Sequence, residues 1–211
     1  MIIYRSKKFC RNEEENETPM GGVSVIGEDI GADKSNNIFL YDTITEHSVL
    51  KIRKAIAKKV VAHRRFLVEN DLDMELLENH LHINLHINSY GGSASDAFNL
   101  HDYIKSCPIP IYTYIEGVAA SAATIISVAG KKRFMTRNSV LMIHQLSSWF
   151  GGKYEEFNDE KANLDLYMII IKKIYIEHTK LTMKKLNALL KRDIYLSTEK
   201  CLEYGFVDEI R

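Results

Sequence analysis

The feature that most constrains this sequence is a repeated order of elements: an apolar strand, a turn of small residues, then a helix. The first unit has a strand with alternating apolar and polar residues at 80–88 and a helix at about 94–105. The second has a strand at 108–115 and a small-residue helix at 119–128, entered through Gly117. Strands that alternate with helices predict an α/β fold.

Further elements are predicted on both sides of these units. Residues 37–41 read NIFLY, a short strand, and residues 46–68 place apolar residues at helical spacing. Residues 69–79 are polar and are predicted as a loop or a short helical insertion. The remaining expectations are strands at 132–135 and 140–143, a helix from the cap Thr182 to about Lys191, a helix from Ser197 or Thr198 to Gly205, and a final strand at Phe206 and Val207.

The two ends of this pattern differ in composition. Residues 1–36 hold an acidic run, one proline and several glycines, so they are predicted as an N-terminal arm that is flexible or processed, before a domain at 37–211. Residues 153–180 predict a long helix whose middle, LDLYMIIIKKIYI, is apolar on nearly every face. A helix of this kind needs a packing partner.

Charge and cysteine content narrow the function classes. The chain has 28 Lys plus Arg against 28 Asp plus Glu, and this balance predicts neither nucleic-acid binding nor binding to an anionic membrane. The three cysteines form no CxxC pair, which favours a reducing compartment. The charged N-terminus lacks a secretory core, and no window approaches the roughly 20 apolar residues of a membrane span. We therefore expect a cytoplasmic protein.

Three residues are candidates for chemistry. Ser121 lies where a strand gives way to a helix, beside the backbone N–H groups and the positive dipole end that stabilise an oxyanion. His144 ends the apolar run VLMIHQ and could serve as a general base, and Asp193 could orient it as the third member of a triad. Taken singly, each has a plainer interpretation: close helix packing, a strand-end histidine and a turn residue.

Two other patterns have weaker chemical interpretations. Gly91 and Gly92 resemble a phosphate loop, but no lysine follows in the required spacing, so they are expected to bring a backbone N–H close to a substrate carbonyl instead. His80, His82 and His86 lie on one face of a strand, which could be read as a metal site. No further ligand is suggested, and no metal is predicted.

Four ordered stretches, taken together, resemble the proteolytic subunit of the Clp protease (ClpP), a family of serine peptidases. They are INSYGGSAS, IEGVAASAAT, NSVLMIHQ and KRDIYLSTEKCLEYGFVDEI. The resemblance covers the chain from about Asn37 to its end and suggests a divergent member, with a virus-encoded one among the options.

The resemblance implies a fold and a site. The family fold is a spiral of ββα units, shared with crotonases, with a protruding handle helix that falls here on 153–180. Ser121 would be the nucleophile, His144 the general base and Asp193 the orienting carboxylate. The backbone N–H groups of Gly92 and Ala122 would form the oxyanion hole, and no metal or organic cofactor would be needed.

The resemblance also implies partners. Subunits of the family form stacked rings around a chamber, joined through the handle helix, and an AAA+ unfoldase feeds them unfolded polypeptides. The glycines Gly151 and Gly152 resemble those of the strand that pairs with extended substrate. The function expected from the resemblance is that of a serine endopeptidase subunit of a self-compartmentalising Clp-type protease.

Several alternatives stay open from the sequence. The chain could be a phage-type capsid maturation protease of the same fold, a non-catalytic ring subunit, or a crotonase-type acyl-CoA enzyme. Spacing alone also leaves open whether Asp193, Asp165 or Asp208 meets His144.

Overall fold

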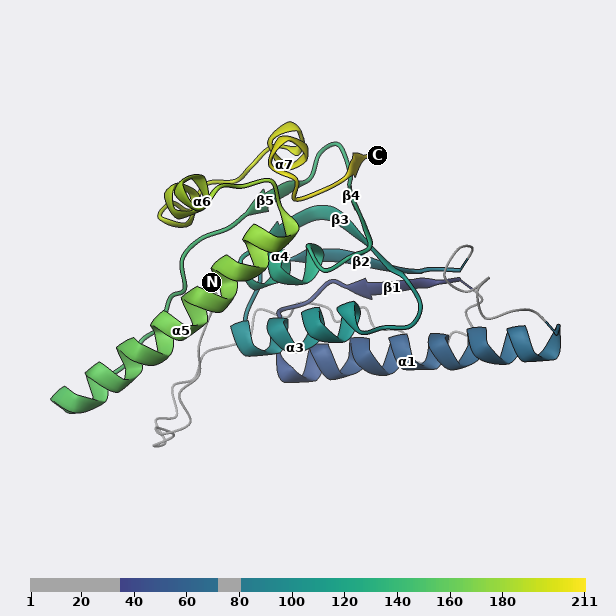
Figure 1. Ribbon diagram of the computed structural model, residues 1–211, viewed down its shortest axis with the longest axis horizontal. Coiled ribbons are helices and arrows are strands. Elements are labelled where there is room, and N and C mark those ends of the chain that lie inside the picture. Colours follow the sequence, from purple (N-terminus) through teal and green to yellow (C-terminus); the bar gives the residue numbers. More distant parts are fainter. Residues whose placement is uncertain (1–34, 72–80) are drawn as a thin grey trace, which may run out of the picture.

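The computed structural model describes residues 35–71 and 81–211, so all but the last two residues of the arm predicted at 1–36, and most of the predicted insertion, lie outside the described residues. A six-stranded sheet forms its centre, and all neighbouring strands of this sheet are parallel (Figure 1). The strand order is β1-β2-β3-β4-β6, and β5 also pairs with β3. The strands are β1 Asn37–Leu40, β2 Ile83–Ser89, β3 Ile111–Ala120, β4 Lys132–Met135, β5 Val140–Met142 and β6 Glu209–Ile210.

Helices follow the strands and confirm the predicted α/β class. Figure 1 shows α1 and α3 side by side along one face of the sheet, and α6 and α7 beyond β5. The apolar alternation of β2 explains this layering, since Ile83, Leu85 and Ile87 are fully buried on one face. The helices are α1 Glu46–Glu69, α3 Ala94–Lys105, α4 Ala122–Ser127, α5 Tyr154–His178, α6 Met183–Leu190 and α7 Thr198–Tyr204.

Helix ends occur where capping residues were expected. Thr182 caps α6 and Ser197 caps α7, each accepting a hydrogen bond from a backbone N–H of the first turn. Gly205 ends α7 in the left-handed conformation, with φ of +76°. At the start of α1, the side chains of Thr45 and Ser48 each accept a hydrogen bond from the other's backbone N–H.

The predicted boundary between β3 and the next helix was wrong. The strand continues through Gly117 to Ala120 and the helix begins only at Ala122. Gly117 has φ of +80°, and the β2 register shifts here, from Ile87 opposite Ile115 to Ser89 opposite Ala119. Beyond this bend β3 pairs with β5 instead of β4, and this pairing keeps the strand extended.

The predicted final strand was also misplaced. Phe206 and Val207 are buried core residues, and the strand that pairs with β4 is β6, two residues further on. Arg133 on β4 anchors the connection between α7 and β6, since it donates hydrogen bonds to the carbonyl oxygen of Gly205 and to the carboxylate of Asp208.

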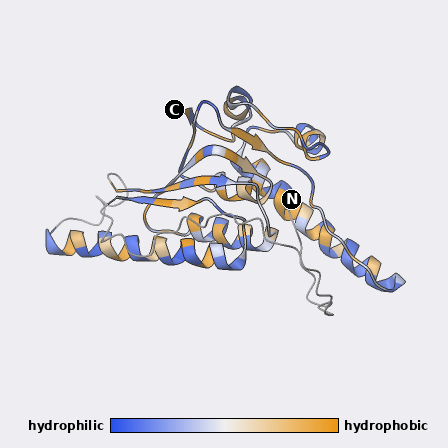
Figure 2. Ribbon diagram, turned by 180° about the vertical axis from the view of Figure 1, so that it is seen from behind, coloured by the Kyte–Doolittle hydropathy of each residue, from blue (hydrophilic) through white to orange (hydrophobic). Residues whose placement is uncertain are grey.

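The long helix α5 projects away from the sheet (Figure 1). Its last turns pack on the core through Ile171, Ile174 and Tyr175, which are buried. Figure 2 shows that its free end is mainly hydrophilic and that hydrophobic residues gather toward the sheet. Leu166 and Ile169 are nevertheless exposed in the single chain, so part of the apolar surface is left without a partner. In the described ranges, no helix has the length and hydropathy that a membrane span requires.

Candidate active site

Ser121 occupies the junction between β3 and α4 in an unusual backbone conformation. Its φ is +59° and its ψ is −126°, outside the regions that non-glycine residues favour. Its N–H donates to the carbonyl oxygen of Met142 at 2.8 Å, and its own carbonyl oxygen accepts from the N–H of Thr124 at 3.0 Å. These hydrogen bonds hold a residue whose conformation costs energy by itself.

Strand pairing brings His144 to Ser121. The parallel register of β3 and β5 places Ala120 opposite Met142, so the two strands end side by side and the residues that follow them lie close together. The Nε2 atom of His144 lies 2.8 Å from the Oγ atom of Ser121, and both residues are buried. The structure therefore places the predicted nucleophile and base within hydrogen-bonding distance.

A short antiparallel contact brings Asp193 to the other side of His144. Leu141 and Leu196 exchange backbone hydrogen bonds of 3.2 and 2.6 Å, which aligns residues 191–196 with the end of β5. The Oδ1 atom of Asp193 lies 3.4 Å from the Nδ1 atom of His144, and 75% of the Asp193 side chain is exposed. The distance is longer than that of a normal N–H···O hydrogen bond, so the contact is loose, and the carboxylate is largely in solvent.

The other two candidate carboxylates have different partners. Asp165 pairs with Lys161 on the exposed side of α5, and Asp208 forms two hydrogen bonds with the guanidinium of Arg133. Of the three alternatives left open by the sequence, Asp193 is the one in contact with His144.

The surroundings favour a neutral imidazole. Burial lowers the pKa of His144 below its ordinary value, and the carboxylate of Asp193 opposes this shift. With Nδ1 facing a carboxylate, the proton of the neutral ring belongs on Nδ1. The Nε2 atom is then free to accept the hydrogen of the Ser121 hydroxyl.

Gly91, the first residue of the glycine pair, lies against this junction. A Cβ atom on Gly91 would be 2.7 Å from the Cβ of Ser121 and 3.0 Å from the backbone nitrogen of Ala122, and Gly91 has φ of +105°. A Cβ atom on Gly92 would collide with the carbonyl of Ile44. Only glycine at position 91 allows the chain to pass this close to Ser121. The sequence analysis expected the pair to bring a backbone N–H close to a substrate carbonyl and did not foresee this packing role of Gly91.

Gly151 and Gly152 lie elsewhere and have no regular structure. The segment from residue 149 to 153 is irregular, and both glycines are exposed. Among the described residues of the single chain, Gly151 and Gly152 are not part of a strand, so the strand expected from the resemblance is not seen there. Instead, Phe150 packs against Phe157, with ring centroids 5.2 Å apart, next to the start of α5.

The histidines of the predicted strand form an aromatic row. His86 stacks between Phe39 and Tyr114, each at 4.9 Å between ring centroids, and its Nδ1 atom lies 2.8 Å from Oε1 of Glu116. His82 stacks on a tyrosine of β3 in the same manner, and His80 lies outside the described residues. The described ranges hold no group of three or more His, Cys, Asp or Glu arranged for a metal.

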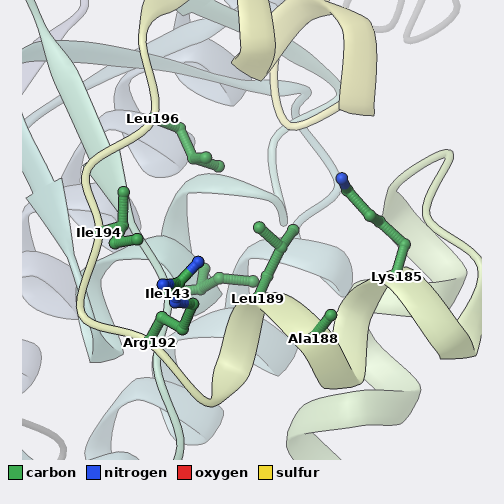
Figure 3. Close-up of a pocket in the computed structure, with 7 residues that line it drawn as sticks. All are labelled: Ile143, Lys185, Ala188, Leu189, Arg192, Ile194 and Leu196. Carbon is green, nitrogen blue, oxygen red and sulfur yellow. The ribbon is translucent and has the colours of Figure 1, made fainter.

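A cavity of about 210 Å³ lies behind the His144 and Asp193 segment (Figure 3). Ile143 and Arg192, which directly precede these two residues, are part of its wall. The other lining residues are Lys185, Ala188, Leu189, Ile194 and Leu196. Ser121, His144 and Asp193 are not among the residues that line this cavity.

Comparison with known proteins gives consistent results. The profile of the Clp protease family matches residues 32–211. The chain is 31% identical over 162 residues to an ATP-dependent Clp protease proteolytic subunit of Dehalococcoides mccartyi, covering 76% of this chain and 78% of that protein. It is 33% identical over 159 residues to the Streptococcus pneumoniae protein of the same name, covering 74% and 78%. A ClpP1 N165D mutant structure from Listeria monocytogenes superposes with a TM-score of 0.67 at 25% identity, covering 83% of this chain and 91% of that one.

Proposed function

The chain belongs to the Clp protease family, and on this basis we propose that it is the proteolytic subunit of a Clp-type protease, acting as a serine endopeptidase. One observation carries the proposal: the 2.8 Å contact between Ser121 Oγ and His144 Nε2, with Asp193 behind the histidine. A hydroxyl next to a neutral imidazole that a carboxylate orients is the arrangement of an activated nucleophile.

The proposed reaction has two stages. In the first, Ser121 Oγ attacks the carbonyl carbon of a peptide bond while His144 Nε2 takes the hydroxyl proton, and His144 then gives this proton to the leaving amine. In the second, His144 takes a proton from water, which attacks the ester on Ser121. The bond between Ser121 Oγ and the acyl carbon breaks, the acid leaves, and His144 returns the proton to Ser121 Oγ. Asp193 stabilises the imidazolium that forms in each stage.

The oxyanion of both stages needs hydrogen-bond donors. We assign this role to the backbone N–H groups of Gly92 and Ala122, because Ala122 follows the nucleophile at the start of α4 and Gly92 follows Gly91, which borders Ser121. In this proposal Gly151 and Gly152 bind extended substrate through their backbone groups. The proposed reaction uses the side chains of Ser121, His144 and Asp193, these backbone groups and water.

The assembly is part of the proposal. The curated relatives are named as proteolytic subunits of an ATP-dependent protease, so we infer that an AAA+ unfoldase supplies unfolded polypeptide and hydrolyses the ATP. Stacked rings would cover the exposed apolar residues of α5, including Leu166 and Ile169.

The test is peptide hydrolysis by the purified chain, with native mass measured on the same sample. We expect cleavage of a fluorogenic peptide by a ring-sized particle, and at least about a 1,000-fold loss for Ser121→Ala in a particle of the same mass. Correctly assembled wild-type rings that leave peptides, and proteins unfolded by the partner unfoldase, uncut would refute the proposal and favour the non-catalytic ring subunit.

A further inference from the structure

A chain of hydrogen bonds joins α5 to the backbone of Ser121. The hydroxyl of Tyr175, near the end of α5, lies 2.6 Å from Oγ1 of Thr124. The same Oγ1 atom lies 2.6 Å from the carbonyl oxygen of Ser121. All three residues are completely buried, and the ring of Tyr175 packs against Phe206 with centroids 6.0 Å apart. One threonine side chain thus connects the long helix to the candidate nucleophile.

The direction of these hydrogen bonds follows from the groups involved. The carbonyl oxygen of Ser121 can only accept, so the Thr124 hydroxyl must donate to it. The oxygen of Thr124 is then the acceptor for the hydroxyl of Tyr175. Burial raises the pKa of Tyr175 above its ordinary value, so the phenol keeps the hydrogen that it donates. Hydrogen bonds aligned in this way polarise one another.

The Ser121 carbonyl shares a planar peptide group with the N–H of Ala122. The described residues contain no cis peptide bond, so the C=O and N–H of this group point in opposite directions. Two hydrogen bonds from Thr124, one from its N–H and one from its hydroxyl, hold the carbonyl oxygen. Fixing the carbonyl therefore fixes the direction of the Ala122 N–H.

From this geometry we propose that Thr124 and Tyr175 are positioning residues for the oxyanion donor at Ala122. They orient the peptide group between Ser121 and Ala122, and they draw electron density toward its carbonyl oxygen, which makes its N–H a stronger donor. The inference rests on the proposed peptidase reaction and adds two residues that do not touch the reacting atoms.

Three substitutions separate the hydroxyl groups from the packing. Tyr175→Phe keeps the ring against Phe206 and removes the donor, Thr124→Val keeps the shape and removes the hydroxyl, and Thr124→Ser keeps the hydroxyl. We expect kcat to fall about 5-fold in Tyr175→Phe and about 10-fold in Thr124→Val, with KM unchanged. The reason is that the weakened interaction is the hydrogen bond from the Ala122 N–H to the oxyanion, which forms only in the transition state. Thr124→Ser should stay within about 2-fold of the wild type.

Thr113 on β3 offers a matched control, because its hydroxyl binds the other end of α4. The buried hydroxyl of Thr113 donates to the carbonyl oxygen of Ser127, the last residue of α4, at 2.7 Å. Thr113→Val removes a comparable hydrogen bond, so its melting temperature should fall as in Thr124→Val, while its kcat should not change. A peptide boronic acid supplies the second measurement, since its tetrahedral adduct on Ser121 places an oxygen in the oxyanion hole. Its affinity should fall in Thr124→Val and Tyr175→Phe by the same factor as kcat.

The outcomes distinguish the inference from the function. If the wild type is active while Thr124→Val and Tyr175→Phe keep its kcat and boronate affinity, the inference is overturned and the proposed function stands. Equal losses of kcat in Thr113→Val and Thr124→Val would also overturn it, because the effect would then be one of stability. A correctly assembled wild type without turnover or boronate binding refutes the proposed function, and the inference with it.

Discussion

Replacing Asp193 by asparagine measures how much the carboxylate contributes to the proposed triad. Its oxygen lies 3.4 Å from His144 Nδ1, and three-quarters of its side chain is exposed. At that distance two charges interact by about 1 kcal/mol in water, and solvated pairs in proteins have similar values. We therefore expect kcat to fall about 5- to 10-fold, far less than the roughly 10⁴-fold loss for a buried triad aspartate.

The pH profile of kcat/KM gives a second readout of the same change. The carboxylate of Asp193 raises the pKa of His144, against the larger lowering by burial. Removing the carboxylate should lower this pKa further, so the acid limb of the profile should move to lower pH in Asp193→Asn. The assay is hydrolysis of a fluorogenic peptide at a series of pH values, with melting temperature measured on the same samples.

Two other aspartates serve as matched controls. Asp208→Asn removes the carboxylate that binds Arg133, and Asp165→Asn removes an exposed pair on α5. The first should lower the melting temperature, the second should change it little, and neither should move the acid limb. An unchanged kcat in Asp193→Asn, or a loss above about 10³-fold, would refute the reasoning, because the carboxylate would then be either unused or buried in the working enzyme.

Three further predictions follow from individual contacts. In the wild type, kcat/KM should rise with pH around a midpoint below the ordinary histidine pKa of about 6.5, since burial lowers the pKa of His144; a midpoint above 7 would contradict this. Gly91→Ala should lower both melting temperature and kcat, because the new Cβ would lie 2.7 Å from that of Ser121, whereas Gly151→Ala meets nothing within 3.7 Å and should keep its melting temperature. Arg133→Gln should reduce the free energy of unfolding by about 2–3 kcal/mol in a denaturant titration, since its guanidinium binds a carboxylate and two carbonyl oxygens; a loss below about 0.5 kcal/mol would count against that role.

The family and the fold could be predicted from the sequence because both depend on local signals. Four ordered motifs indicated the Clp protease family, and the family profile and the curated relatives confirm it. Periodicity and capping residues such as Thr182 and Gly205 placed the helices. The end of β3 was misplaced because small residues favour a helix there, while the pairing with β5 that overrides this preference is a tertiary contact.

In the candidate site, too, the residues with local sequence signals could be predicted and those that depend on tertiary contacts could not. Ser121 and His144 were found through motifs, and the strand register explains why they meet. The resemblance pointed to Asp193, but spacing alone could not separate it from Asp165 and Asp208. The contact between Leu141 and Leu196 that positions Asp193 has no local signature in the sequence. Thr124 and Tyr175 were missed for a similar reason. A tyrosine in an apolar helix is expected to be a core residue, and the hydroxyl of Thr124 that it contacts is 51 residues away in the sequence.

The central claim is that His144 activates Ser121 as a nucleophile. Its most direct test is labelling of the assembled wild-type protein with a fluorophosphonate probe, followed by peptide mapping of the adduct and by the same experiment on His144→Ala and Ser121→Ala. The account predicts one adduct per chain on Ser121, labelling slowed at least about 100-fold in His144→Ala, and none at this position in Ser121→Ala. An adduct on another residue, or labelling of Ser121 at the wild-type rate without His144, would contradict it.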